Sequence, residues 1–133
     1  MGHVKKLIIA GQTILEIDYA DLNEAEMKDL VVEAKNIALA ENRPLLVLSI
    51  FNNKNYLTPG YMRHTEKSIA DVLHLIDKQA IVGLSFTQKF ILTGFNIILQ
   101  RNFETFDTRD DAIRYLLDKD NPETDLPEHF KKK

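Results

Sequence analysis

The sequence of 133 residues contains no cysteine. The chain can therefore form no disulfide, no thiol nucleophile and no thiolate metal site, and this composition suits a reducing cytoplasm. Basic residues are also few, because 17 lysines and arginines face 20 aspartates and glutamates, for a formal net charge of −3. Nucleic-acid-binding domains normally carry a basic face, and the clearest basic cluster here is the terminal KKK, so we expect no nucleic-acid partner.

Long hydrophobic runs are missing too. The longest apolar-rich segment, residues 86–100, is interrupted by Thr93, Gly94 and Asn96. Crossing a bilayer takes about 20 apolar residues. The short apolar run near the start is followed at once by acids, which does not match a signal peptide. We therefore expect a cytoplasmic protein, with peripheral attachment to a membrane as an open alternative.

Catalytic signatures are absent from the sequence, which holds no glycine-rich phosphate loop, no nucleophile elbow and no HExxH string. His64 and His74 are separated by ten residues, about 80° from a common helical line, so they do not form a metal-binding pair. Helix capping explains the acids between Asp18 and Glu26 better than a divalent-cation site does. We expect no catalytic residue, no cofactor and no metal, and therefore no enzyme.

The chain instead alternates between strand-like and helix-like segments. Short apolar runs predict strands at residues 4–9, 13–19, 43–51, 79–85 and 102–106, and longer amphipathic patterns predict helices at 21–42, 57–77, 86–100 and 107–119. This order predicts an α/β fold with a single mixed β-sheet of about five strands and about four helices. We expect one domain over residues 1–120, followed by a polar tail over residues 121–133.

Two of these segments have patterns that make more specific predictions. In residues 13–19, apolar and polar side chains alternate enough to predict a strand with one wetter face. In residues 57–77, Thr58 is the expected helix N-cap and Pro59 the first helical residue. The inner face of that helix is predicted to carry Met62, Ile69, Val72, Leu73 and Ile76.

The segment 86–100 raises the main functional question. At helical spacing one narrow polar stripe forms, which consists of Lys89, Thr93, Asn96 and Gln100. Ser85 and Gln88 have the spacing of a capping box. The remaining apolar arc covers on the order of 200°, whereas packing on a sheet takes about 100°. On a helical wheel, Phe95 and Ile98 face the sheet, while Leu92 and Leu99 lie on the outer flank.

Three explanations of the wide apolar arc remain open. Neighbouring helices and the N-terminal hairpin could cover it, it could form a homo-oligomer or partner surface, or it could hold an apolar ligand or lie on a membrane. The candidate surface consists of Leu92, Leu99 and Phe90, with Gly94 permitting close approach of another backbone or a ligand, or a kink.

A second candidate site is the loop NNKNYLTPG, residues 52–60. It follows a strand that is predicted to be central, and ligands of α/β sheets bind where such strands end. The residues that we select there are Asn53, Tyr56 and Thr58.

The element order and two strings, QAIVG and NFETFDTRDDAIRYL, resemble the SpoIIAA-like branch of the STAS superfamily over roughly residues 14–117. The family typically ends with an aromatic, an acid-led cap, an alanine and a Trp-Leu pair. The matching residues here are Phe103, Phe106, Asp107, Ala112, Tyr115 and Leu116, with tyrosine in place of tryptophan. The resemblance implies a non-enzymatic regulatory module that acts by protein–protein contact. The fold is also similar to CRAL-TRIO lipid-binding domains, which leaves a lipid or other apolar ligand as the alternative.

Anti-sigma-factor antagonists of this family carry an Asp-Ser-Ser-Gly motif whose second serine takes a phosphate. The nearest match here is LTPG, in which Leu57, Thr58, Pro59 and Gly60 occupy the four positions. Proline has no hydroxyl, so the antagonist's phosphorylation switch does not transfer directly. Thr58 is the nearest hydroxyl and the candidate phosphosite, and helix capping is its simpler role.

Overall fold

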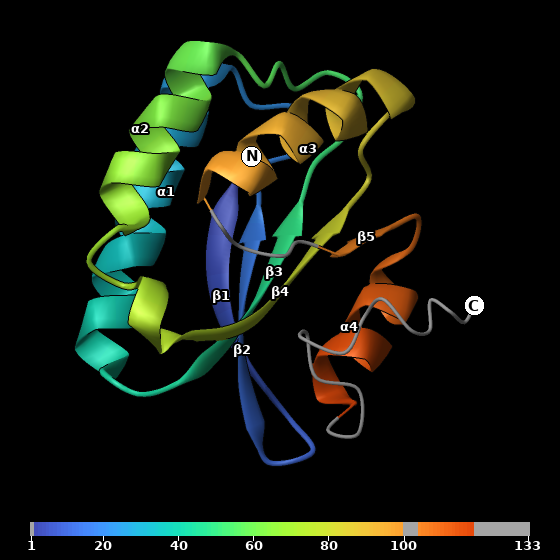
Figure 1. Cartoon of the computed structure of the whole chain (residues 1–133). Coiled ribbons are helices and arrows are strands. Elements are labelled where there is room, and N and C mark those ends of the chain that lie inside the picture. The colour runs from blue at the N-terminus through green and yellow to red at the C-terminus, as the bar shows by residue number, and fades with distance from the viewer. Residues whose placement is uncertain (1, 100–103, 119–133) are drawn as a thin grey trace.

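The computed structural model describes residues 2–99 and 104–118, with the backbone alone for residues 93 and 95–99. A five-stranded sheet has the strand order β1-β2-β3-β4-β5, with β1 antiparallel to β2 and the other pairs parallel. The strands are β1 (His3–Ile9), β2 (Gln12–Asp18), β3 (Leu45–Ile50), β4 (Ile76–Val82) and β5 (Glu104–Phe106). The helices are α1 (Glu24–Glu41), α2 (Pro59–Ile69), α3 (Phe86–Leu99) and α4 (Arg109–Leu117), with the 3₁₀ helix η1 (Leu73–Leu75) before β4. The predicted mixed α/β sheet is confirmed (Figure 1).

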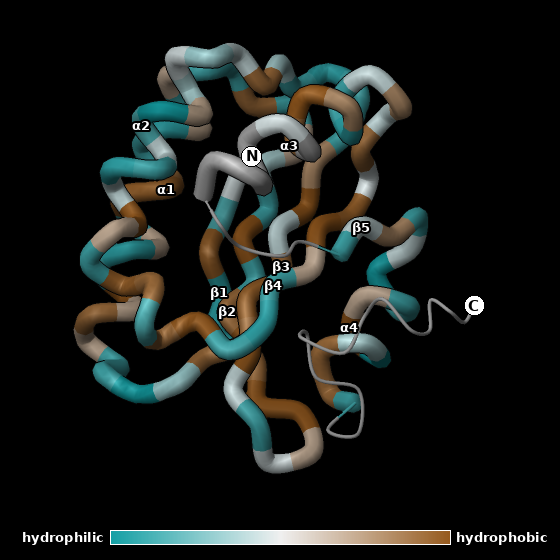
Figure 2. The backbone as a smooth tube through the Cα atoms, viewed as in Figure 1, coloured by the Kyte–Doolittle hydropathy of each residue, from teal (hydrophilic) through white to brown (hydrophobic). Residues whose placement is uncertain are grey.

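Helices cover both faces of the sheet. Side chains of α1, α2 and α3 pack on one face, and α4 packs on the other. The prediction of a wetter face in residues 13–19 is wrong, because Ile14 and Glu16 on the α4 side are as buried as Leu15 and Ile17 on the other. Figure 2 shows the resulting apolar character along the central strands.

Polar contacts hold α4 to the sheet at both ends. At its start, the guanidinium of Arg109 donates to Oε1 of the buried Glu16 from Nη2 at 2.7 Å and from Nε at 3.0 Å. At its end, Nζ of Lys78 on β4 donates to the carbonyls of Tyr115 at 3.0 Å and Asp118 at 2.6 Å. A cation at the last carbonyls of a helix also complements the helix dipole.

Burial by itself raises the pKa of Glu16, but the hydrogen bonds from Arg109 and His3 outweigh it and hold that pKa below its ordinary value. The carboxylate is therefore ionised in the folded protein at neutral pH, and its negative charge is matched by the Arg109 guanidinium.

The helix predicted at residues 57–77 is shorter than expected. Thr58 and Pro59 begin it as predicted, but α2 ends at Ile69, and Ile76 already belongs to β4. The sheet decides this boundary, because Ile76 pairs with Leu45 on the central strand and starts the ladder that continues to Val82. Leu75, and not Leu73, is the buried residue of η1.

Candidate binding surface at the carboxyl end of the sheet

Three loops meet where the parallel strands β2, β3 and β4 end, at the upper edge in Figure 1. They are residues 19–23, 51–58 and 83–85, and they lead into α1, α2 and α3. In open α/β sheets this edge is the usual place for a binding site. The loop selected from the sequence, residues 52–60, lies in the middle of it, because β3 is the central strand.

A buried asparagine ties two of these loops together. Nδ2 of Asn55 donates to the carbonyls of Tyr19 at 2.9 Å and Leu22 at 3.0 Å, and its Oδ1 accepts from the backbone N–H of Asn52 at 2.8 Å. The side chain thereby satisfies three backbone groups that have no strand or helix partner at these positions. Asn55 was not selected from the sequence, because an asparagine in a turn is ordinary turn chemistry.

Gln88 connects α3 to the same loop. Its Nε2 donates to the carbonyls of Asn55 at 2.7 Å and Asn52 at 3.0 Å. Its Oε1 accepts from the backbone N–H of Ser85, and its own backbone N–H donates to the Ser85 hydroxyl, so the predicted capping box is confirmed. The sequence indicated the cap but not the contact with the loop.

The side chain of Asn52 links the loop to the start of α1. Its Nδ2 donates to Oδ1 of Asp21 at 2.8 Å, while its Oδ1 accepts from the backbone N–H groups of Asp21 and Lys54. Asn23 caps α1 and forms a capping box with Glu26. The acids of this region thus have structural contacts, and in the part of the chain that the structure describes no three potential metal ligands cluster.

Thr58 caps α2 as predicted, because its hydroxyl accepts from the backbone N–H of Tyr61 at 3.0 Å. The same hydroxyl donates to Oε1 of Glu24 on α1 at 2.8 Å. This hydrogen bond, together with the ion pair to Lys28, keeps the pKa of Glu24 below its ordinary value. The Thr58 hydroxyl is therefore engaged as both donor and acceptor, and its role as a phosphosite stays a prediction.

Around this network, three aromatic side chains point into solvent. Tyr56 in the loop is 77% exposed, and Phe86 and Phe90 on α3 are 84% and 74% exposed. Phe86 and Phe90 lie one turn apart on the same side of α3. We call Tyr56, Phe86 and Phe90 the aromatic surface. Asn53, which was also selected from the sequence, is exposed in the same loop.

The placement of Leu92 on an outer flank of α3 is wrong. Leu92 is 7% exposed and belongs to the core on the α1–α2 side of the sheet. Gln88, one turn earlier, points inward to bind the loop, and this contact turns Leu92 inward and Phe86 and Phe90 outward. The helical wheel could not show this, because it does not include the contact of Gln88 with a loop that is distant in the sequence.

The other predictions for α3 have mixed outcomes. Gly94 is exposed, and a Cβ atom built there would meet nothing within 4 Å, so no backbone of the described chain approaches it closely. The side chains of Leu99, Phe95 and Ile98 lie outside the described residues, as does the tail predicted at residues 121–133.

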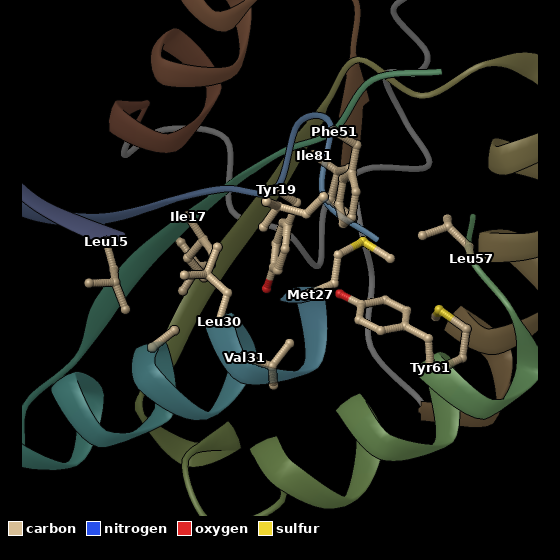
Figure 3. Close-up of a cluster of buried hydrophobic side chains, with 14 of the residues drawn as sticks. Leu15, Ile17, Tyr19, Met27, Leu30, Val31, Phe51, Leu57, Tyr61 and Ile81 are labelled. Atoms are coloured by element: carbon tan, nitrogen blue, oxygen red, sulfur yellow. The ribbon is translucent and has the colours of Figure 1, made fainter. Parts of the chain in front are cut away.

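Beneath the surface, two adjoining cavities of about 60 Å³ each lie between the sheet and α1–α3. The walls that they share are Tyr19, Ser49, Thr65, Ile69 and Gln79. Tyr19 stacks on Phe51 with ring centroids 4.7 Å apart and meets Tyr61 edge-on at 6.5 Å. Figure 3 shows these rings directed into the space between sheet and helices. Burial raises the pKa of Tyr61 to about 12 and that of Tyr19 well above its ordinary value, so both phenols are neutral.

Comparisons with known proteins identify the fold. No family model matches the chain. No curated protein matches it. Among solved structures, the chain is similar to an uncharacterised protein of the DUF3478 family with a SpoIIAA-like fold, from Shewanella loihica PV-4. The two are 16% identical, the match covers 86% of this chain and 93% of that chain, and the TM-score is 0.63. The fold is therefore SpoIIAA-like, as the sequence resemblance implied. None of the described helices is both long and apolar enough to cross a membrane.

Proposed function

We propose that this SpoIIAA-like domain is a non-enzymatic regulatory module that binds a partner protein through the aromatic surface. The observation that carries the proposal is the exposure of Tyr56, Phe86 and Phe90 at one edge of the fold, each more than 70% accessible. Exposed tyrosine and phenylalanine are enriched at protein interfaces, where they bury a large area with few rotatable bonds.

The hydrogen-bond network behind the surface supports this function. Gln88 lies between Phe86 and Phe90 in the chain and binds the carbonyl of Asn55, the residue before Tyr56. The loop and the helix that carry the aromatics are therefore ordered relative to each other before any partner arrives. An ordered surface loses less conformational entropy on binding, which favours affinity.

The structure supports an apolar ligand at the aromatic surface less well than it supports a protein partner. Leu92, one of the residues selected from the sequence as a ligand or partner surface, is buried in the core, and each cavity of about 60 Å³ is smaller than a 150 Å³ cavity that accepts benzene. Neither of these two cavities has room for a lipid chain, and we assign the aromatic surface to a protein partner.

Site-specific photo-crosslinking in the native host would test the proposal. A photoreactive phenylalanine analogue at Phe90 should give a discrete covalent adduct with another protein. Ile8 is the matched control, because it is 69% exposed and apolar but lies beside the hairpin turn at the opposite edge of the sheet. The double variant Phe86→Ser/Phe90→Ser should remove an adduct formed at Tyr56 without changing the melting temperature.

Three results would contradict the proposal. The first is an adduct at Ile8 equal to that at Phe90, or no adduct at either position. The second is a self-adduct whose loss accompanies the loss of a dimer in sedimentation, which would assign the surface to a second copy. The third is co-sedimentation with lipid vesicles that the double variant abolishes, which would assign it to a membrane.

A further inference from the structure

The paired cavities in the core contain polar groups without partners. Oγ1 of Thr65 is shielded from solvent and has no hydrogen-bond partner among the described residues, although the side chain lies close enough to the Tyr61 phenol to lower its pKa against the effect of burial. Ser49 on β3 and Gln79 on β4 line both cavities as well. Within residues 2–99 and 104–118, neither of their side chains has a hydrogen-bond partner.

Such groups are unusual in a folded core. More than about 90% of buried polar groups are hydrogen-bonded, and each one left unsatisfied costs about 1–3 kcal/mol. The shielded Thr65 hydroxyl on α2 borders both cavities, together with the side chains of Ser49 on β3 and Gln79 on β4. A bound molecule that formed a hydrogen bond with the Thr65 hydroxyl would recover part of this cost, and Ser49 and Gln79 could bind the same polar group.

We infer that the two cavities together form a binding site for one small uncharged molecule with an apolar body and a single hydroxyl or carbonyl group. The polar end would bond to Thr65, Ser49 and Gln79 in the shared wall. The rest of the lining is mostly aliphatic and aromatic, with Val31, Ala34 and Val72 around one cavity and Leu57, Leu84 and Leu92 around the other.

Charge and size narrow the class of ligand. The charged residue in the lining is Lys35, whose Nζ already pairs with Asp71 at 3.3 Å, so a buried ionic group would find no free counter-charge there. An unpaired charge in such a site is far more costly than a neutral polar group. Two cavities of about 60 Å³ offer about 120 Å³, somewhat less than a cavity that accepts benzene. A ligand of a few heavy atoms, or a single ring after small side-chain shifts, fits this space.

This site is independent of the aromatic surface, because its walls contain none of Tyr56, Phe86 and Phe90. Phenol and toluene are suitable probes, since toluene has the same ring with a methyl group in place of the hydroxyl. In amide-detected NMR titrations of the whole chain, phenol should produce saturable shifts around Ser49, Thr65 and Gln79. It should bind about two- to tenfold more tightly than toluene, which corresponds to one net hydrogen bond.

Thr65→Val keeps the shape of the side chain and removes the hydroxyl. It should weaken phenol about two- to tenfold and leave toluene unchanged. Thr87→Val is the matched control, because Thr87 is an exposed threonine in the first turn of α3, and it should change neither affinity. Equal affinity of the wild-type protein for phenol and toluene would overturn the inference. So would the absence of saturable shifts at about 10 mM phenol, which would leave water as the only occupant.

Discussion

Replacing Asn55 by alanine removes the side chain that joins the loop of the aromatic surface to the start of α1. Three hydrogen bonds are lost, two from Nδ2 to the carbonyls of Tyr19 and Leu22 and one from the backbone N–H of Asn52 to Oδ1. Each contributes about 0.5–1.5 kcal/mol net, so the free energy of unfolding should fall by about 1.5–4.5 kcal/mol. The upper half of this range applies if no water molecule forms hydrogen bonds with the backbone groups that lose their partner.

Asn53→Ala is a matched control, because it makes the same chemical change two residues earlier in the loop. Asn53 is exposed and engages no hydrogen bond among the described residues, so its replacement should change the free energy of unfolding by no more than about 0.5 kcal/mol. Urea unfolding followed by circular dichroism measures both variants, and equal m-values would show that midpoint shifts reflect stability.

The two variants should also differ in partner binding. Asn55→Ala should weaken photo-crosslinking from Tyr56, because the loop loses its fixed position, whereas Asn53→Ala should preserve it. If Asn55→Ala cost less than about 1 kcal/mol, or if the two variants were equally unstable, the network would not be what orders this loop.

Three further predictions concern the core, α4 and the cap of α2. Leu92→Ala should lower the free energy of unfolding by about 2–5 kcal/mol and Phe90→Ala by no more than about 0.5 kcal/mol, and equal urea midpoints would refute the assigned rotation of α3. Arg109→Ala should cost about 1.5–3 kcal/mol at pH 7, because it leaves the buried carboxylate of Glu16 without its guanidinium. The lowered pKa of Glu16 means that the stability it contributes is present above the ordinary value of 4.5 and is lost as the pH falls further. The cost of Arg109→Ala should therefore shrink in acid, and a pH-independent cost in urea titrations would count against this ion pair. Thr58→Ala should cost about 0.5–2 kcal/mol and Thr58→Ser close to nothing, and a large loss in the serine variant would show that capping is not the main role.

Local sequence patterns were sufficient to predict the strands and helices and several of the positions at which they begin. The alternation of short apolar runs with amphipathic helices predicted the five strands and four helices that the structure contains. The caps at Thr58 and at Ser85 with Gln88 followed from side chains that bond to backbone groups within a few residues. These interactions are local, so their geometry is implied by spacing along the chain.

Packing between distant segments decided the rest. The sequence pattern predicted that Glu16 faces solvent. In the structure Glu16 is buried and pairs with Arg109 of α4, which lies 93 residues further along the chain. The pattern also predicted that Ile76 lies on the inner face of a helix, but Ile76 pairs with β3 and belongs to the sheet. The apolar arc of α3 was visible in the sequence, but which part of it faces solvent depends on Gln88 reaching the carbonyls of Asn52 and Asn55. A helical wheel assigns faces by hydrophobicity alone, whereas one buried hydrogen-bonding side chain turns the helix and leaves Phe86 and Phe90 in solvent.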